Sequence, residues 1–371
     1  MGSEWRNITL GDFVALQRGH DLTAEERRTG HVPVFGAAGH NGYHDTAIAK
    51  GPGIVVGRSG GSFGQVHYSK EDFWPHNTGL YVKDFKGNDP RFAFYLLTAL
   101  DFDSYNSGSA QPSLNRNFIY PIPVRVPPPI EQKAISRVLS NLDDEIELNH
   151  RINAELEGMA KLLYDYWFVQ FDFPDANGKP YQSSGGKMVY NPTLKREIPE
   201  GWEAISVSEF AAIKTGKEDA NYATDDGVFH FFTCGEAALR CNDFVFDGKA
   251  VLLAGNGSFA VKKYEGKFNA YQRTYVLIPN DENLFAPLYF VVLNRISTFT
   301  SGSRGSIVKF ITKGDIEDIF LPLPRSRELD FTSILSSLFS QSARLYEENI
   351  ELTNLRDWLL PMLMNGQVTV E

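Results

Sequence analysis

Four stretches of this 371-residue chain contain no Asp or Glu although they carry Lys and Arg. A surface that faces a polyanion repels carboxylates and attracts basic side chains, while Ser, Asn, Gln and backbone amides can bond to phosphate oxygens and base edges. The alternative is that each stretch is a buried strand or a glycine turn, and their recurrence in both halves of the chain weighs against it. The acid-free stretches are residues 46–70, 104–130, 248–264 and 283–314.

Sixteen polar side chains in or beside these stretches have the chemistry to contact DNA. Arg and Gln can bond bidentately to guanine and adenine edges, whereas Lys mainly neutralises phosphate. For each residue the alternative is a solvated loop position or a phosphate contact without base recognition. The candidates in the first half are Arg58, Ser59, Ser62, Gln65, Gln111, Ser113, Asn115 and Arg116. Those in the second half are Asn256, Ser258, Lys262, Lys263, Gln272, Arg273, Arg304 and Lys309.

The motifs that would indicate catalysis or a bound cofactor are incomplete. Residues 255–260, GNGSFA, match the GxGxxA dinucleotide fingerprint, but the segment that follows reads as strands rather than as the required helix. Residues 51–59, GPGIVVGRS, have the wrong glycine spacing for a phosphate-binding loop. Cys234 and Cys241 have no nearby His pair, and we expect reduced thiols. The sequence therefore predicts a non-catalytic chain with no metal site and no cofactor of its own.

The chain repeats itself at an offset of about 197 residues. The matched segments keep their order, so the chain consists of two copies of one unit, each a mixed strand and loop region followed by a helix. The matches are WRNITLGDFVALQRG (5–19) with WEAISVSEFAAIKTG (202–216), residues 54–68 with 251–264, and SGSAQPS (107–113) with SGSRGSI (301–307).

A heptad pattern follows each copy, with two series of largely apolar residues at seven-residue intervals, which is typical of a coiled coil. Adding 196 to the first pattern gives the second, which favours two helices that pack on each other, most simply antiparallel. The alternative is that each helix packs only on its own domain. Asn153 and Asn349 fall at equivalent seam positions, where a polar side chain can fix the register. The predicted pairing residues are Leu142, Asn153, Leu156, Leu163, Leu338, Asn349, Leu352 and Leu359.

The expected fold class is α+β, with two mixed α/β domains joined by two long helices in an antiparallel coiled coil. The net charge of −10 is concentrated in the two helical regions, which carry −4 each. There is no signal-peptide pattern and no run of 18 apolar residues, so we expect a cytoplasmic protein without a membrane span. The expected boundaries are 1–128 for the first domain, 129–170 for the first helix, 171–201 for a linker, 202–325 for the second domain and 326–371 for the second helix.

Two quoted segments resemble a known family. The segment SGSAQPSLNRNFIYPIPVRVPPPIEQKAISRVLSNLDDEIELNHRINAELEGMAKLLYDYWFVQFDF (107–173) resembles the junction between target-recognition domain and helix in specificity subunits of type I restriction-modification systems. IPEGWEAISVSEF (198–210) resembles the usual start of the second half of those subunits. The second junction departs from the pattern: Arg304-Gly305 replaces Gln111-Pro112, and PRSREL replaces PPPIEQ.

This resemblance implies a mechanism. Each globular half would recognise one part of an asymmetric, two-part site in double-stranded DNA, and the paired helices would set the gap between the parts. The helices would also dock two methyltransferase subunits, which bring S-adenosylmethionine, and two ATP-dependent restriction subunits that need Mg could join them.

Three other functions remain open from the residues alone. The chain could be a DNA reader of a complex that only methylates. It could be a DNA methyltransferase with its own cofactor site. It could also be a scaffold that binds two protein partners and does not contact DNA.

Overall fold

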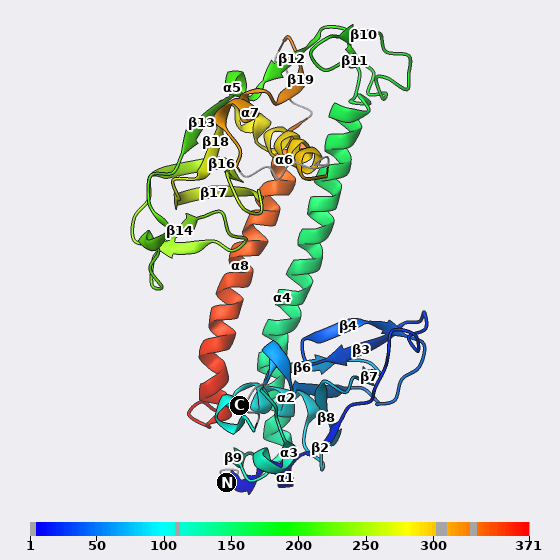
Figure 1. Cartoon of the computed structure of the whole chain (residues 1–371), viewed down its shortest axis with the longest axis vertical. Helices are drawn as coiled ribbons and strands as arrows, with labels where there is room; N and C mark the ends of the chain where they lie inside the picture. Colours follow the sequence, from blue (N-terminus) through cyan, green and yellow to red (C-terminus); the bar gives the residue numbers. More distant parts are fainter. Residues whose placement is uncertain (1–4, 108–111, 302–309, 327–331, 371) are drawn as a thin grey trace. The chain divides into compact units, whose positions relative to one another are not determined.

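The computed structural model describes residues 5–107, 112–301, 310–326 and 332–370. The chain divides into two compact units, one formed by Met1–Leu148 with Asn349–Glu371 and the other by Asn149–Glu348. The two longest helices, α4 (Pro129–Tyr164) and α8 (Ser333–Met364), each contribute residues to both units. Helix, strand and irregular segments occur in both units, so the fold class is α+β, as the sequence predicts (Figure 1).

The first unit holds two small sheets and a terminal strand pair. One sheet has the order β2-β8-β5-β6, the other has the order β4-β3-β7, and β1 pairs with β9. Helix α2 packs against β5 and β6 (Figure 1). The strands are β1 (Arg6–Thr9), β2 (Ala15–Arg18), β3 (Val32–Gly36), β4 (Gly39–His44), β5 (Gly53–Gly57), β6 (Val66–Ser69), β7 (Trp74–Pro75), β8 (Gly79–Asp84) and β9 (Pro123–Val126). The shorter helices are α1 (Leu10–Phe13), η1 (Gly60–Ser62), α2 (Pro90–Thr98), η2 (Asp103–Tyr105) and α3 (Arg116–Ile119).

The second unit is built on one six-stranded sheet of order β13-β18-β16-β17-β14-β15. Strands β12 and β19 pair separately, and α6 covers β16, β17 and β18 (Figure 1). The strands are β12 (Trp202–Ser206), β13 (Ala211–Thr215), β14 (Phe229–Phe232), β15 (Leu239–Cys241), β16 (Phe246–Ala254), β17 (Val261–Ala270), β18 (Thr274–Pro279) and β19 (Phe320–Pro324). The shorter helices are α5 (Val207–Phe210), η4 (Ala220–Tyr222), η5 (Glu282–Leu284), α6 (Phe285–Ser301) and α7 (Lys313–Glu317).

The segment between α4 and β12 contains a single π-helical turn, η3 (Asp165–Val169), and a hairpin of β10 (Met188–Asn191) and β11 (Arg196–Pro199). Stacked aromatic rings connect this segment to β12, because Phe173 lies against Trp202 and also against Tyr181 of the segment itself. The predicted linker is therefore ordered by aromatic packing and a hairpin.

The internal repeat is visible in the local structure. Each copy of the repeat begins with a strand and a one-turn helix closed by a capping box, Thr9 with Asp12 in the first copy and Ser206 with Glu209 in the second. Each box satisfies free backbone amides at the helix start. Each of these initial strands pairs antiparallel with the last strand of its copy, β1 with β9 and β12 with β19. The two copies thus fold alike at their boundaries.

Helix α4 starts at Pro129, where a missing amide proton costs no hydrogen bond. Its first turns bury Ile135 and Leu139 in the core of the first unit, together with Leu363 of α8. Its last turns bury Ala160 in the core of the second unit, together with Leu335 of α8. Both long helices are therefore part of the domain cores.

The two long helices run in opposite directions where they meet within the first unit. Arg356 contacts Asp143, and Asn349 contacts the carbonyl of Ile146. The later residue of α8 therefore contacts the earlier residue of α4, which is the antiparallel arrangement. The predicted coiled coil remains a prediction, but the seam residues are suitably placed because each of them is buried or half-buried. They are Leu142, Asn153, Leu156, Leu163, Leu338, Asn349, Leu352 and Leu359.

Candidate nucleic-acid interface

The first unit has an open hollow of about 810 Å³ lined mainly by polar side chains. Three segments form it: the end of β2, the turn after β5, and the loop that leads into α3. Arg18, Arg58 and Arg116 supply positive charge, and Asp21 supplies one carboxylate, which accepts a hydrogen bond from Asn77. The lining residues are Gln17, Arg18, Gly19, His20, Asp21, Arg58, Leu80, Ser107, Ser113, Leu114, Asn115, Arg116 and Asn117.

Backbone hydrogen bonds fix the loop before α3 against the turn after β5. The amide of Leu114 donates to the carbonyl of Arg58 at 2.8 Å, and Ser59 forms a β-bridge with Ser113. Ser107 donates to the carbonyl of Ser113 through its amide at 3.0 Å and its hydroxyl at 2.7 Å. The described part of the loop is therefore held at both ends, which presents its polar side chains at a fixed place.

Two of the three arginines in the hollow, Arg58 and Arg116, donate to neutral acceptors. Arg116 donates to the carbonyl of Leu16 at 3.1 Å, and Arg58 lies 3.5 Å from the carbonyl of Asn77. Asn115 caps α3 by accepting from the amide of Asn117 at 3.0 Å. Because carbonyl oxygens carry no formal charge, the guanidinium groups keep a net positive charge that can attract phosphate.

Gly19 allows the chain to pass close to the loop after β7. A Cβ atom there would lie 2.1 Å from the carbonyl oxygen of His76. The equivalent residue in the repeat, Gly216, would place a Cβ atom 1.9 Å from the carbonyl oxygen of Ala270. Both copies therefore need glycine directly after their second strand, β2 in the first copy and β13 in the second.

The hollow brings together four of the eight residues predicted in the first half: Arg58, Ser113, Asn115 and Arg116. Ser59 lies on the bridge at its edge, whereas Ser62 and Gln65 lie in the β5–β6 connection and do not line it. Gln111 lies outside the described residues. Gln17, Arg18 and His20 also line the hollow but were not predicted from the sequence. The repeat match that ends at Gly19 was the one sequence signal in this segment.

His20 is half-buried, and one of its ring nitrogens is fully buried. Its Nε2 has no hydrogen-bond partner among the residues that the structure describes, and its ring lies 6.1 Å from that of Tyr81 and 6.4 Å from that of Trp74. A buried nitrogen without a partner is costly in the free chain and suits a group that a ligand satisfies.

The second unit repeats the same backbone junction. The amide of Ile311 donates to the carbonyl of Gly255 at 2.8 Å, as Leu114 donates to Arg58, and Gly255 in turn donates to the carbonyl of Arg273 at 2.8 Å. The Ser258 hydroxyl donates to the carbonyl of Cys234 at 3.3 Å. The predicted residues Asn256, Ser258, Gln272 and Arg273 therefore lie on two adjacent turns, between β16 and β17 and between β17 and β18. Arg304 and Lys309 lie outside the described residues.

The two neighbouring lysines of β17 have different environments. Lys262 donates to the carbonyl of Gly235 and lies over the ring of Phe232 at 5.9 Å, and partial burial lowers its pKa. Lys263 pairs with Glu157 of α4 at 2.6 Å and lies 5.0 Å from the ring of Phe339. Lys263 stays a predicted DNA contact, and its ammonium group is paired with a carboxylate within the second unit.

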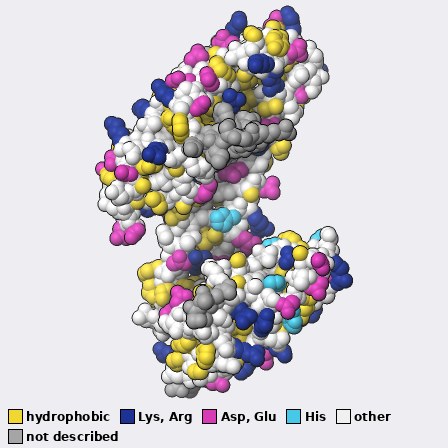
Figure 2. All heavy atoms as spheres, in the orientation of Figure 1, with side chains coloured by type: hydrophobic (Ala, Val, Ile, Leu, Met, Phe, Trp, Pro, Cys, Tyr) yellow, Lys and Arg dark blue, Asp and Glu magenta, His cyan; other side chains and the backbone are white. Residues whose placement is uncertain are grey.

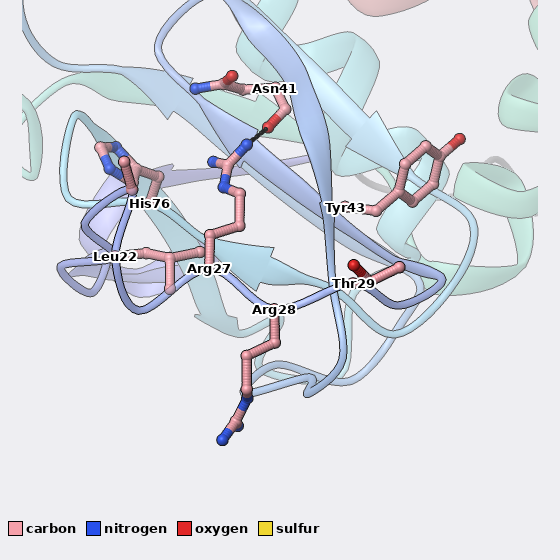
Figure 3. A pocket seen from close by; sticks show the side chains of 8 residues that line it. Leu22, Arg27, Arg28, Thr29, Asn41, Tyr43 and His76 are labelled. Carbon is pink, nitrogen blue, oxygen red and sulfur yellow. Dashed lines mark hydrogen bonds between the residues drawn. The ribbon is translucent and has the colours of Figure 1, made fainter.

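A second hollow of about 510 Å³ lies beside the first in the loop 20–31 and the β4 hairpin. Figure 3 shows Arg27 pointing toward Asn41, with a hydrogen bond of 2.6 Å to its carbonyl oxygen, while Arg28 points away. Arg28 pairs with Asp45 at 2.7 Å. Figure 2 shows Lys, Arg and His side chains on the visible face of this unit, with Asp and Glu side chains among them. The hollow extends the polar surface around His20 and His76.

The described residues contain no group of three or more His, Cys, Asp or Glu side chains that could hold a metal ion. The GNGSFA segment joins β16 to β17, so a strand follows it and the helix that a dinucleotide site requires does not. Among the described residues no helix is both long and apolar enough to cross a membrane.

Comparison with known proteins agrees with the duplicated architecture. Residues 2–158 and 199–353 each match the profile of the family described as Type I restriction modification DNA specificity domain. The chain belongs to this family. It carries two specificity domains, and the two matches coincide with the two copies of the repeat.

Individual relatives carry the same family name. The chain is 42% identical over 181 residues to the EcoDI specificity subunit of Escherichia coli, a match that covers 47% of this chain and 40% of the relative. It is 23% identical over 310 residues to the MjaIX specificity subunit of Methanocaldococcus jannaschii, covering 76% of this chain and 69% of the relative. The EcoDI match thus spans less than half the length of that subunit.

A solved structure shares the whole fold. The S subunit of a type I restriction-modification system from M. genitalium superposes with a TM-score of 0.70 and covers 98% of this chain and 96% of that one. The sequence identity is 17%, so the likeness concerns the fold.

Proposed function

We propose that this chain is the DNA-reading specificity subunit of a type I restriction-modification complex and that it recognises a two-part, asymmetric DNA site. The observation that carries this proposal is the shared backbone junction, Leu114 on Arg58 in one domain and Ile311 on Gly255 in the other. Two domains with one scaffold and different side chains at the same place suit two half-sites of different sequence.

The first domain reads its half-site with the residues of its hollow. Arg58 and Arg116 have the fork geometry to bond guanine O6 and N7, and Asn115 and Gln17 can bond adenine. Arg18 is exposed at the rim and serves a phosphate. In the second domain Asn256, Ser258, Gln272 and Arg273 take these roles, with Lys262 at the edge.

The chemistry comes from partner subunits in this proposal. Two exposed apolar pairs, 196 residues apart, offer docking sites for two methyltransferase subunits that carry S-adenosylmethionine. Met159 and Leu162 of α4 are 50% and 70% exposed, and Leu355 and Trp358 of α8 are 43% and 61% exposed. Exposed apolar side chains in pairs on a helix favour a partner helix. Two restriction subunits with ATP and Mg would join this core.

The test is selection from a random duplex library by the chain assembled with its methyltransferase. We expect enrichment of two short motifs separated by a gap of constant length. Enrichment of one continuous motif, or no sequence preference, would contradict the proposal. Calorimetry of the chain alone with S-adenosylmethionine should show no binding, and binding would favour a methyltransferase that carries its own cofactor site.

A further inference from the structure

Asp143 of α4 is the acceptor at which three elements of the first unit meet. One of its carboxylate oxygens accepts hydrogen bonds from the Tyr95 hydroxyl at 2.5 Å and from the Arg91 guanidinium at 3.2 Å, both on α2. The other oxygen accepts a bond from Arg356 of α8 at 3.1 Å. One side chain therefore connects the first recognition domain to both long helices.

This polar joint is largely shielded from water. The side chains of Arg91 and Asp143 are 17% and 19% exposed, and Arg91 also stacks on the ring of Tyr68 at 4.5 Å. Hydrogen bonds to an ionised carboxylate are strong and directional in such surroundings. The neighbouring pair of Asp144 with Lys70 is more than half exposed on both sides, so solvent screens it.

The second unit has an apolar joint at the equivalent place. On the long helices the repeat has an offset of 196, so Phe339 is equivalent to Asp143 and Ala160 is equivalent to Arg356. Between α2 and α6 the offset is 195, so Phe290 is equivalent to Tyr95 and Ala286 is equivalent to Arg91. Burial supports this offset, because it aligns two fully buried residues of α2, Ala93 and Leu97, with two fully buried residues of α6, Leu288 and Val292.

The apolar joint contains aromatic rings and alanines where the first unit has charged and hydroxyl groups. The rings of Phe290 and Phe339 lie 5.5 Å apart, and both alanines are fully buried in the same core. Apolar contacts depend weakly on direction, whereas a carboxylate that accepts three bonds at once permits one arrangement of its donors. At this equivalent place the two domains thus contact the helices through different chemistry, although the second domain also has an ion pair to α4 elsewhere, between Lys263 and Glu157.

We propose that Asp143 is a positioning residue that fixes the orientation of the first recognition domain on α4 and α8, and through it the gap length that the complex accepts between half-sites. This inference rests on the proposed function. Asp143 does not line the DNA-reading hollow, so its loss changes where the first half-site is presented and leaves unchanged which bases are read.

The experiment measures methylation by the assembled complex on DNA whose half-sites are separated by the natural gap or by one base pair more or less. For Asp143→Asn, the ratio of the rate at the natural gap to the rate at the altered gaps should fall at least tenfold. The matched control Asp144→Asn, the same change at the adjacent exposed residue, should keep the wild-type ratio. A purely structural role would lower all the rates together and keep the ratio, and that result would overturn the inference.

Tyr95→Phe provides the second variant, because it removes one donor to Asp143 and keeps every charge. If Asp143→Asn does not assemble, the gap ratio of Tyr95→Phe decides: a fall of at least threefold supports the inference, and an unchanged ratio overturns it. Failure of the wild-type complex to require two half-sites would instead contradict the proposed function, so the two failures are distinguishable.

Discussion

The amide of Leu114 donates a 2.8 Å hydrogen bond to the carbonyl oxygen of Arg58, and this bond sets the loop before α3 on the turn after β5. In the second copy Ile311 makes the same bond to Gly255. The two copies share this backbone hydrogen bond, but the residue whose carbonyl accepts it is arginine in the first copy and glycine, without a side chain, in the second. One scaffold can therefore present two different sets of reading groups.

Arg116→Ala should weaken binding of the assembled complex to its cognate site by about 1–3 kcal/mol and relax one position of one half-site. Arg18→Ala, a rim residue, should weaken cognate and random duplexes equally and lower the salt dependence of binding. Titration of both variants at two salt concentrations separates these outcomes. Equal losses on cognate and random DNA for Arg116→Ala would remove it from the base-reading set.

Gly19→Ala should destabilise the first unit by about 1–3 kcal/mol, because its methyl group would meet the backbone of His76. Gly61→Ala is the matched control, since a Cβ atom there meets nothing within 4 Å. Thermal unfolding of the two variants measures the difference. Equal melting temperatures would show that the backbone can move apart at Gly19 without cost.

Lys263→Met should leave DNA binding within twofold of wild type, because the lysine is paired with Glu157 inside the second unit. Arg273→Ala, on the exposed turn between β17 and β18, should weaken binding measurably. Filter or gel-shift titration of the assembled complex compares them. A larger loss for Lys263→Met than for Arg273→Ala would show that Lys263 contacts DNA.

His230 should make stability depend on pH. Burial lowers its pKa from 6.5 to about 4, and the ring stacks on Phe232 at 5.8 Å. On acidification the unfolded chain binds this proton at a higher pH than the folded chain does. The contribution of neutral His230 to the free energy of unfolding is therefore complete above pH 6.5 and falls by up to about 3 kcal/mol as the pH drops toward 4. His230→Phe should reduce the difference in unfolding free energy between pH 7 and pH 4.5. A slope equal to that of wild type would show that His230 is not the responsible group.

The helices were predictable because their signal is local and periodic. Leu352 and Leu359 repeat at seven-residue spacing, and a helix of this length needs no distant partner to be recognised. The repeat likewise predicted that Gly19 and Gly216 are equivalent, and in the structure a Cβ atom at either position would collide with a backbone carbonyl oxygen.

Parts of the site were not predictable because they depend on direction and long-range contacts. The search for acid-free basic stretches could not distinguish Lys262 from Lys263. Successive side chains of a strand point to opposite faces, and Lys263 is the one that lies against Glu157 of α4. Arg18 and His20 were missed because Asp21 follows them and no acid-free run marks the segment. The joint at Asp143 combines residues 52 and 213 positions apart, and no local pattern connects them.

Single-molecule methylome sequencing of a host that expresses this chain with its methyltransferase is the most direct test of a duplicated reader. We expect one methylated motif made of two short parts with a constant gap, and we expect Arg116→Ala to degenerate one part only. A single continuous motif, or loss of both parts in that variant, would contradict the assignment of one half-site to each domain.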